Sequence, residues 1–600
     1  VYLTIMLTLE IQNQQLNTSA DFSVQIEDQN PATKFDEIPG DLSLNIELPG
    51  NDLNRTILNN PDRFEKMGSS DDRRFTNACL RLNGQIIQKG TLIIEETTNA
   101  YSGWVRGAVG NLAEKTAGKY INQSMLSGEK MFVNKDSYDP GTDDYACPKI
   151  FNRHFWRDRG RKAKRTIVST DIEGNEYNTE VEDGELTFQF FSNQDFFVNK
   201  PGESGLVGSG TNTAPVLSPM LFLYRVIELV LSDYYVFVKD NFVKNDAELK
   251  KLIIYNNFNI IKQNMLNVES KYVFVQDYWE NRNVQLSVQS INIVYSFAGK
   301  FFYRDLLPQS KIGDFIRSCQ NLLNVVFSFN DLNECRIVDR QQLLVAPAYD
   351  VDEYMVGEWK LGERKNVTVK LSMSHDEQDA AFGDNWQDLS DMRENIKEPV
   401  LQRVDLDILD PELDEIRKVL ADDCYYQYHW YVATTINKKN EEEEVDVLGW
   451  ERISIGFQPY FYNDGDKDLE EIKTDFSTLR QSENGYPVVM QKGNAESFKT
   501  QFASFSPRLL FYLGDEAGSY RTSTMSLDYD GEFGLAKKRW NYWLPFWANR
   551  LPAKAIFQFP ASVFYYIRNN KAILPLRTRH GSFIIDKMRA IAGRQDMIEC

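Results

Sequence analysis

The chain has 600 residues, and its 67 basic and 87 acidic side chains give a formal net charge of −20 at pH 7. This length corresponds to roughly three to five domains, and the acidic balance excludes nucleic-acid binding through the overall field of the protein. The six cysteines show no CxxC spacing, which argues against a zinc site or a disulfide scaffold and suits a reducing cytoplasm. We expect no signal peptide, and the most apolar helical run, Met220–Leu231, is too short to span a bilayer.

Residues 1–110 are predicted to form an N-terminal β-barrel that carries one long loop. Alternating apolar and polar residues predict strands at Tyr2–Ile11, Phe22–Ile26, Leu42–Leu48, Phe75–Leu82, Ile86–Glu95 and Tyr101–Val105. Pro49-Gly50 ends the third of these strands, and a polar excursion follows it. Asn83-Gly84 separates the fourth strand from the fifth, and Asn-Gly between two strand-like runs is a strong signal for a β-hairpin.

Residues 111–215 are predicted to be an insertion rich in loops, with one helix. Apolar spacing predicts this helix at Asn111–Ser124, and Leu186–Phe190 and Asp195–Val198 have the pattern of strands. Gly202–Ala214 is rich in Gly, Ser, Thr and Asn, which is typical of a loop or linker.

Residues 216–345 are predicted to be an α+β domain. Ser218-Pro219 is typical of a helix start, with Ser as the N-cap and Pro at the first helical position. Helical spacing also predicts a helix that ends near Leu323 and leads directly into a β-hairpin. The predicted strands of this domain are Tyr234–Val238, Leu252–Asn257, Leu286–Tyr295, Val325–Phe329 and Cys335–Val338.

Residues 346–600 form the last predicted unit, in which strands alternate with acidic insertions. Its predicted strands are Asn366–Met373, Tyr425–Thr435, Ile453–Phe461 and Leu509–Gly514. The acidic stretches 376–397 and 439–475 interrupt this pattern, and such charge runs are usually solvated.

The order of elements in residues 40–105 resembles the N-terminal domain of bacteriophage tail-hub (baseplate-hub) proteins. That order is strand, Leu-Pro-Gly-Asn, polar loop, strand, Asn-Gly, strand ending in Lys-Gly-Thr-Leu, strand. The phrases S-P-x-L-F-L…V-I-E-L-V, from Ser218, and I-G-D-F-I-R-S…N-V-V-F-S-F-N-D, from Ile312, resemble tail-hub-like proteins of Bacteroides-group phages and prophages. Hub proteins of contractile injection systems are related to this family.

The resemblance implies a mainly β fold with α+β segments, in which a helix-plus-hairpin domain joins two tail-hub-type β-barrels. Phe583–Met588 then looks like the final strand pair of the second barrel. It also implies a structural virion protein at the tail tip that acts as a trimer and is not an enzyme. Its partners would be the tail tube protein, distal tail or baseplate proteins, and a spike or fibre, while DNA passes through without sequence-specific binding.

The sequence favours no catalytic site, metal site or cofactor. Only four histidines occur, and HExxH, P-loop and GxSxG motifs are missing. Cys424 and His429 are five residues apart, which on one strand places them on opposite faces and favours an aromatic strand over a nucleophile pair. Asp464–Asp468 concentrates oxygen ligands without the EF-hand order, so a solvated turn and a calcium site both stay open.

One strongly basic segment stands out as a candidate contact between subunits. Aromatic and basic residues alternate in it, which leaves an exposed loop, or binding to DNA or an anionic cell surface, as alternatives. Its acidic partner on a neighbouring subunit or tail protein is expected among Glu441–Glu444 or Asp464–Glu471. The candidate contact residues are Arg153, Arg157, Arg159, Arg161, Lys162, Lys164 and Arg165.

Two other functions remain open on the sequence alone. Aromatic-rich β-proteins with many carboxylates often bind sugars, so a carbohydrate-active or cell-wall-degrading tail protein is the main alternative. A monomeric host-binding protein on the outer surface of the tail is the other. With 87 acidic residues, neither composition nor spacing selects a pair of carboxylates for glycoside hydrolysis.

Overall fold

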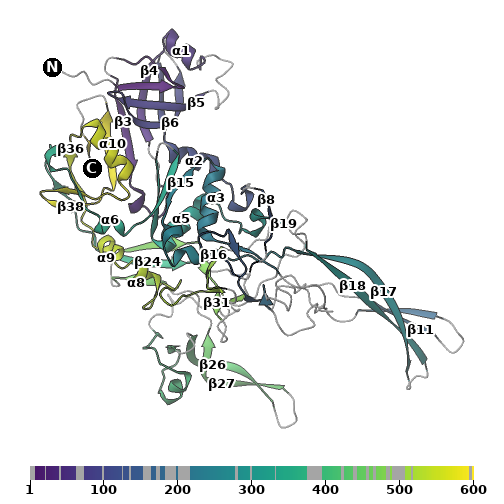
Figure 1. Cartoon of the computed structure of the whole chain (residues 1–600). Helices are drawn as coiled ribbons and strands as arrows, with labels where there is room; N and C mark the ends of the chain where they lie inside the picture. The colour runs from purple at the N-terminus through teal and green to yellow at the C-terminus, as the bar shows by residue number, and fades with distance from the viewer. Residues whose placement is uncertain are drawn as a thin grey trace.

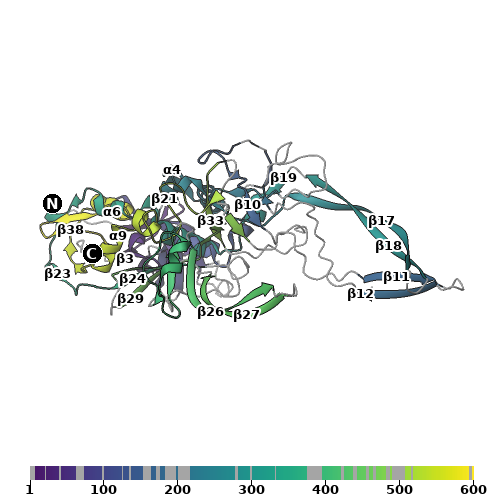
Figure 2. The same cartoon turned by 90° about the horizontal axis from the view of Figure 1, so that it is seen from below.

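The structure is a computed structural model, and it shows a mainly β protein with several sheets (Figure 1). One end of the molecule is a curved sheet, the centre is an α+β body, and two β-ribbons project from that body (Figures 1 and 2). The described residues are 7–19, 22–38, 42–61, 73–97, 100–124, 126, 128–133, 135, 137–152, 164–170, 176–182, 197–199, 217–277, 282–297, 300–330, 333–374, 395–420, 424–436, 442–453, 459–463, 468–481, 487–489, 507–514, 518–592 and 598–599.

A ten-stranded sheet forms a half-barrel from strands of both chain ends. Its members are β1 (Leu7–Ile11), β2 (Gln14–Gln15), β3 (Val24–Gln29), β4 (Leu42–Pro49), β5 (Arg74–Leu82), β6 (Gln85–Thr97), β7 (Ala100–Arg106), β36 (Ile556–Phe557), β39 (Lys587–Ala592) and β40 (Ile598–Glu599). Their order is β2-β1-β5-β6-β7-β4-β3-β39-β40-β36. The predicted hairpin is confirmed, and Asn83 and Gly84 have the positive φ angles, 50° and 81°, that its two-residue turn requires.

The predicted polar loop of the half-barrel contains a short helix, α1 (Asp52–Ile57). The Asn51 side chain accepts a hydrogen bond of 2.9 Å from the backbone N–H of Asn54, which caps the helix. The buried Asn54 side chain in turn donates to the carbonyls of Asn17 and Pro49. The sequence analysis predicted only a polar excursion here, so this helix was not expected.

The prediction that Phe583–Met588 is the final strand pair of a second barrel is wrong. Phe583 ends β38 (Gly581–Phe583), whereas β39 pairs antiparallel with β3 in the half-barrel, with Gln29 opposite Lys587. Met588 is buried in the same core as the N-terminal strands. The alternation of residues identified strand-forming segments, but it carries no information about which distant strand each one pairs with.

A buried charge cluster connects the half-barrel to the C-terminal helix α10 (Ala561–Asn570). The Asp28 carboxylate of β3 accepts hydrogen bonds from Arg568 Nε at 3.1 Å and Lys571 Nζ at 3.0 Å. The Asn30 side chain donates to the backbone carbonyls of Lys571 at 2.9 Å and Ile585 at 2.8 Å. The two ends of the chain therefore fold as one body.

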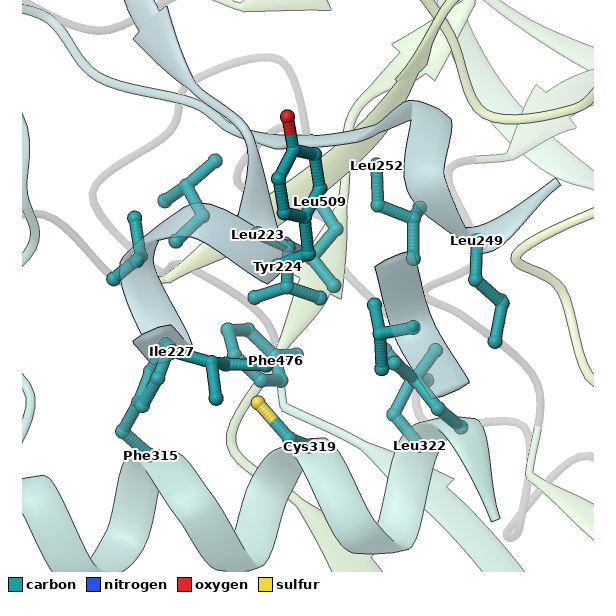
Figure 3. Packing of buried hydrophobic residues seen from close by; sticks show 14 of the residues in the cluster. Leu223, Tyr224, Ile227, Leu249, Leu252, Phe315, Cys319, Leu322, Phe476 and Leu509 are labelled. Atoms are coloured by element: carbon teal, nitrogen blue, oxygen red, sulfur yellow. The ribbon is translucent and has the colours of Figure 1, made fainter. Parts of the chain in front are cut away.

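The central body is built around two amphipathic helices, α3 (Leu223–Asp233) and α5 (Ile312–Leu323). Phe315, Cys319 and Leu322, spaced for one face of α5, point toward Leu223 and Ile227 of α3 (Figure 3). Beside them lies a sheet made of β16 (Leu252–Ile254), β30 (Ser477–Thr478), β33 (Arg508–Tyr512) and β34 (Gly518–Ser519). The core thus combines segments that are more than two hundred positions apart in the sequence.

The helix and the strand pair predicted around Leu323 are both present. Helix α5 leads into β20 (Val325–Phe329), which pairs antiparallel with β21 (Glu334–Asp339). The helix predicted from Ser218 instead begins at Leu223, because Met220–Leu221 forms β14 and pairs with β9 (Tyr145–Ala146). The Ser218 hydroxyl donates to the Asn256 side chain at 2.8 Å and does not cap a helix.

The predicted insertion is only partly covered by the described residues. Helix α2 (Ala108–Thr116) begins earlier than predicted and ends before Gly118, whose φ is +68°. Strand β13 (Phe197–Val198) lies within the predicted Asp195–Val198 run. Leu186–Phe190 and Gly202–Ala214 lie outside the described residues.

The remaining elements are short. The other helices are α4 (Phe242–Asn245), α6 (Gln342–Val345), α8 (Leu535–Arg539) and α9 (Trp543–Ala548), with 3-10 turns at Pro31–Thr33, Ile121–Gln123, Leu249–Lys251, Tyr303–Leu306, Asp352–Tyr354 and Arg403–Ile408. The other strands of the body are β8 (Glu129–Met131), β10 (Ile150–Asn152), β15 (Phe237–Asn241), β19 (Lys300–Phe302), β22 (Tyr349–Asp350), β23 (Lys360–Leu361), β24 (Thr368–Met373), β28 (Tyr460–Tyr462), β29 (Leu469–Thr474), β31 (Arg480–Gln481), β32 (Pro487–Val489), β35 (Ala553–Lys554) and β37 (Leu576–Thr578).

Candidate assembly surfaces

The first projection from the body is a long β-ribbon that belongs to a four-stranded sheet, here called the arm. The arm consists of β11 (Lys164–Thr170), β12 (Glu176–Glu182), β17 (Ile261–Asp277) and β18 (Arg282–Phe297), in the order β12-β11-β18-β17. Sixteen residue pairs join β17 to β18, a length of about 50 Å at the usual rise per residue. The sequence predicted only Leu286–Tyr295 of this ribbon as a strand.

The arm extends far beyond the central body in both views (Figures 1 and 2). Strands β17 and β12 form its edges, and among the described strands nothing pairs with the outer edge of β17. Apolar residues occupy paired positions along the ribbon, such as Val273 opposite Leu286 and Val268 opposite Ile291. A ribbon with apolar positions and an open edge outside its own body is typical of an assembly element.

The predicted basic contact segment leads from the body into this arm. It follows β10 (Ile150–Asn152), and its last two residues, Lys164 and Arg165, begin β11. In the register of the arm, Lys164 lies opposite Glu182 and Arg165 lies opposite Val181. The other candidates, Arg153, Arg157, Arg159, Arg161 and Lys162, lie outside the described residues.

The second projection is an acidic module, defined here as residues 395–453. It contains β25 (Ile416–Val419), β26 (Cys424–Ile436) and β27 (Glu442–Ile453) in one antiparallel sheet. The module separates β24 from β28, yet these two strands pair with each other, with Val369 opposite Tyr462. It is therefore an insertion whose two ends return to neighbouring strands of the body.

The acidic module has a very small core. Leu406, Val419 and Tyr426 are its buried cluster, and Trp450 packs against them. The Trp450 indole N–H donates to the Leu406 carbonyl at 3.1 Å, which fixes the 3-10 turn at Arg403–Ile408 against β27. Among the residues of the module whose burial is described, this cluster is small, so it supplies little apolar burial to stabilise a three-stranded sheet.

Large apolar side chains are concentrated on the surface of the same module. Of 22 exposed large hydrophobic residues in the described chain, eight belong to the module. Trp430, which is 62% exposed, lies directly opposite Leu448 on the neighbouring strand. The eight are Leu401, Val404, Ile408, Leu413, Leu420, Trp430, Val445 and Leu448. An apolar surface on so small a core is characteristic of an interaction site.

The charge of the module is strongly negative. Residues 395–453 contain 15 acidic and seven basic residues. His429 Nε2 lies 2.8 Å from Glu451 Oε2 of the adjacent strand. The histidine that is five residues from Cys424 in the sequence therefore has a carboxylate partner.

A second charged surface of the opposite sign lies on the body and is named here the basic strip, residues 356–365 with 550–554. Its centre is the pairing of β23 with β35, in which Lys360 lies opposite Lys554 and Leu361 opposite Ala553. Five basic and two acidic residues occur in these two segments. Val356, Leu361 and Leu551 are exposed on it at 53%, 63% and 44%.

In the other acidic candidate, Asp464–Glu471, the described carboxylates Glu470 and Glu471 are paired within their own chain. Glu470 accepts from Arg550 Nη2 at 2.6 Å and from the Trp547 indole at 2.9 Å. Burial raises the pKa of Glu471, but hydrogen bonds from Ser372 and Lys370 outweigh it and leave the pKa lower than usual. These two carboxylates are therefore already paired with groups of their own chain, which makes them poor candidates for a contact with a neighbouring subunit.

Most of the possible calcium site lies outside the described residues. Asp464–Lys467 lie outside the described residues, and the backbone carbonyl of Asp468 accepts a hydrogen bond from Thr368 N–H at 2.9 Å. Within the described ranges, no group of three or more His, Cys, Asp or Glu residues is arranged to hold a metal ion. In that same part of the chain, no helix has the length and apolar character needed to cross a membrane.

Comparison with known proteins gives no family for the chain. No protein-family model matches it, and no curated protein matches it either. The arm, the acidic module and the basic strip are therefore the features that bear on function.

Proposed function

We propose that the chain is a structural, non-enzymatic subunit of the hub at the tip of a phage tail. It adapts a hexameric tail tube to a trimeric spike or fibre and leaves a passage for the genome. The observation that carries this proposal is that two β-projections extend from a body in which strands of both chain ends share one sheet. Long ribbons and an apolar module outside the body suit a protein whose work is to join copies and neighbours.

The proposal includes the two barrel domains per chain that the resemblance to tail hubs implies. Three copies with two barrels each would place six similar domains around the axis and match the six-fold tail tube. The half-barrel formed by both chain ends supports the first of these domains. A net charge of −20 supports the passage of DNA, because a negative surface does not retain a polyanion.

The basic segment gives the first test of assembly. Changing Arg157, Arg159, Arg161 and Lys162 together to glutamine is expected to weaken assembly and leave the isolated chain folded. Solvent-exposed charges in general contribute at most about 1 kcal/mol each to fold stability. Light scattering coupled to gel filtration measures the mass of the assembly, and circular dichroism checks the fold.

A matched variant shows whether the effect on assembly depends on where the four charges lie or only on the net charge of the chain. Lys115, Lys119, Lys537 and Lys538 are exposed elsewhere on the chain, and changing all four to glutamine alters the net charge by the same amount. This control is expected to assemble as the unmodified chain does. Normal assembly of the basic-segment variant would show that the segment is not a subunit contact.

A further inference from the structure

Five of the eight exposed apolar side chains of the acidic module occur in one short segment. Between residues 401 and 420, five large apolar side chains are each at least half exposed. They are Leu401 at 70%, Val404 at 63%, Ile408 at 83%, Leu413 at 60% and Leu420 at 50%. Asp407, Asp410 and Glu412 are exposed in the same segment, so this stretch, named here the 401–420 surface, presents both apolar and acidic side chains.

The basic strip has the complementary chemistry. Lys360, Arg364 and Lys365 are exposed, and none of them forms an ion pair with another described residue. Val356 and Leu361 are exposed in the same segment, as are Glu358 and Glu363, so basic residues outnumber acidic ones by three to two there. Apolar and mainly basic side chains on the strip complement apolar and acidic side chains on the module, as the two sides of a specific protein interface do.

The basic strip is held rigidly enough to act as a preformed surface. Gly362 N–H donates to the Pro552 carbonyl at 2.8 Å, and Lys365 N–H donates to the Arg550 carbonyl at 2.8 Å. The Trp359 ring stacks on His580 at 5.5 Å and meets Phe583 edge-on at 5.2 Å. The backbone of the strip is thereby fixed on both sides before any partner binds.

The two surfaces lie on different parts of one molecule. Figure 2 shows β23 of the basic strip at the end that carries β38, and β26 and β27 of the acidic module on the lower side of the body. One copy therefore presents the two patches separately. A contact between two different patches is heterologous, and repetition of it closes a ring when the rotation between copies allows.

We propose that the 401–420 surface of the acidic module docks on the basic strip of the next copy of this chain. The inference rests on the proposed function, because it names the contact through which copies of the hub meet. A second copy fits better than an unrelated basic protein, since both complementary surfaces occur on the one chain. The Asp464–Glu471 stretch is not used, because Glu470 and Glu471 already have partners in their own chain.

Charge reversal on each side tests the docking. Lys360→Glu, Arg364→Glu and Lys365→Glu form the strip variant, and Asp407→Lys, Asp410→Lys and Glu412→Lys form the module variant. Each alone brings like charges together and is expected to raise the concentration needed for half-assembly by about tenfold or more. Combining both variants in one chain restores opposite charges across the contact and is expected to recover most of the assembly. Sedimentation velocity over a concentration series measures all three.

The outcomes distinguish this inference from the proposed function. An unmodified chain that stays monomeric at every concentration overturns both. An unmodified chain that assembles, while neither reversal weakens it, overturns the docking and leaves the hub proposal standing. Weakening by each reversal without recovery in the combined variant also overturns the docking, because it shows that the two surfaces do not meet. Reversal of the exposed Lys115, Lys119 and Lys537 to glutamate controls for net charge and is expected to leave assembly unchanged.

Discussion

Replacing Asp28 with asparagine is expected to lower the free energy of unfolding by about 3–5 kcal/mol, because it removes the partner of buried cations. The side chains of Asp28 and Arg568 are each 3% exposed, and that of Lys571 is 12% exposed. Asparagine keeps the size of the side chain and loses its charge, so both cations lose the carboxylate to which they donate. Urea unfolding of the isolated chain, followed by tryptophan fluorescence, measures the difference.

Glu27 is the matched control for this experiment, since it is the preceding residue of β3. It pairs with Lys587 at 3.0 Å and Arg589 at 2.6 Å on the solvent side of the sheet. Hydrogen bonds from Lys587, then from Arg589, lower the pKa of Glu27, so its contribution is present above the usual Glu pKa and lost as the pH falls through the lowered value. Glu27→Gln is expected to cost less than about 1 kcal/mol at neutral pH. Equal losses in the two variants would contradict the role given to Asp28.

Trp540→Ala is expected to cost about 3–5 kcal/mol, as for other fully buried tryptophans. Trp540 is fully buried, its ring centroid lies 6.0 Å from that of Phe35, and the Arg340 guanidinium lies 5.7 Å from it. Arg340 is also fully buried, and burial lowers its pKa to about 9. Removing the indole therefore leaves a cavity and takes away one of the aromatic faces that hold a buried cation.

Tyr542 provides the comparison for Trp540, because it lies two residues further along and is 61% exposed. Its backbone N–H donates to the Gln341 side chain at 3.2 Å, a bond that alanine keeps. Tyr542→Ala is expected to change the free energy of unfolding by less than about 0.5 kcal/mol. A Trp540→Ala variant as stable as Tyr542→Ala, measured by the same urea titration, would show that the aromatic cluster is not part of the core.

Local elements of the fold were predictable from the sequence, because they depend on neighbouring residues. Asn83-Gly84 has the backbone angles of a hairpin turn, and the apolar spacing of α5 places Phe315 and Cys319 on one buried face. Long-range pairing was not predictable in the same way. The pairing of β39 with β3 depends on how two chain ends meet, which alternation within either strand does not encode.

For the candidate surfaces too, local features were predictable from the sequence and the three-dimensional arrangement was not. The basic run before β11 was visible as charge, but nothing in it revealed that β11 pairs with β12 and β18 in the arm. The module surface was missed because Leu401, Ile408 and Leu413 look like ordinary core residues in a sequence. Their exposure becomes evident only when the small core of Leu406 and Val419 is seen beside them.

The most direct test of the proposed function is a cryo-electron microscopy reconstruction of the assembled particle that contains this chain. We expect three copies arranged around the tail axis, with the 401–420 surface of each acidic module against the basic strip of the next copy. We also expect an open passage along that axis. A single copy, or copies attached to the outer surface away from the axis, would contradict the hub assignment.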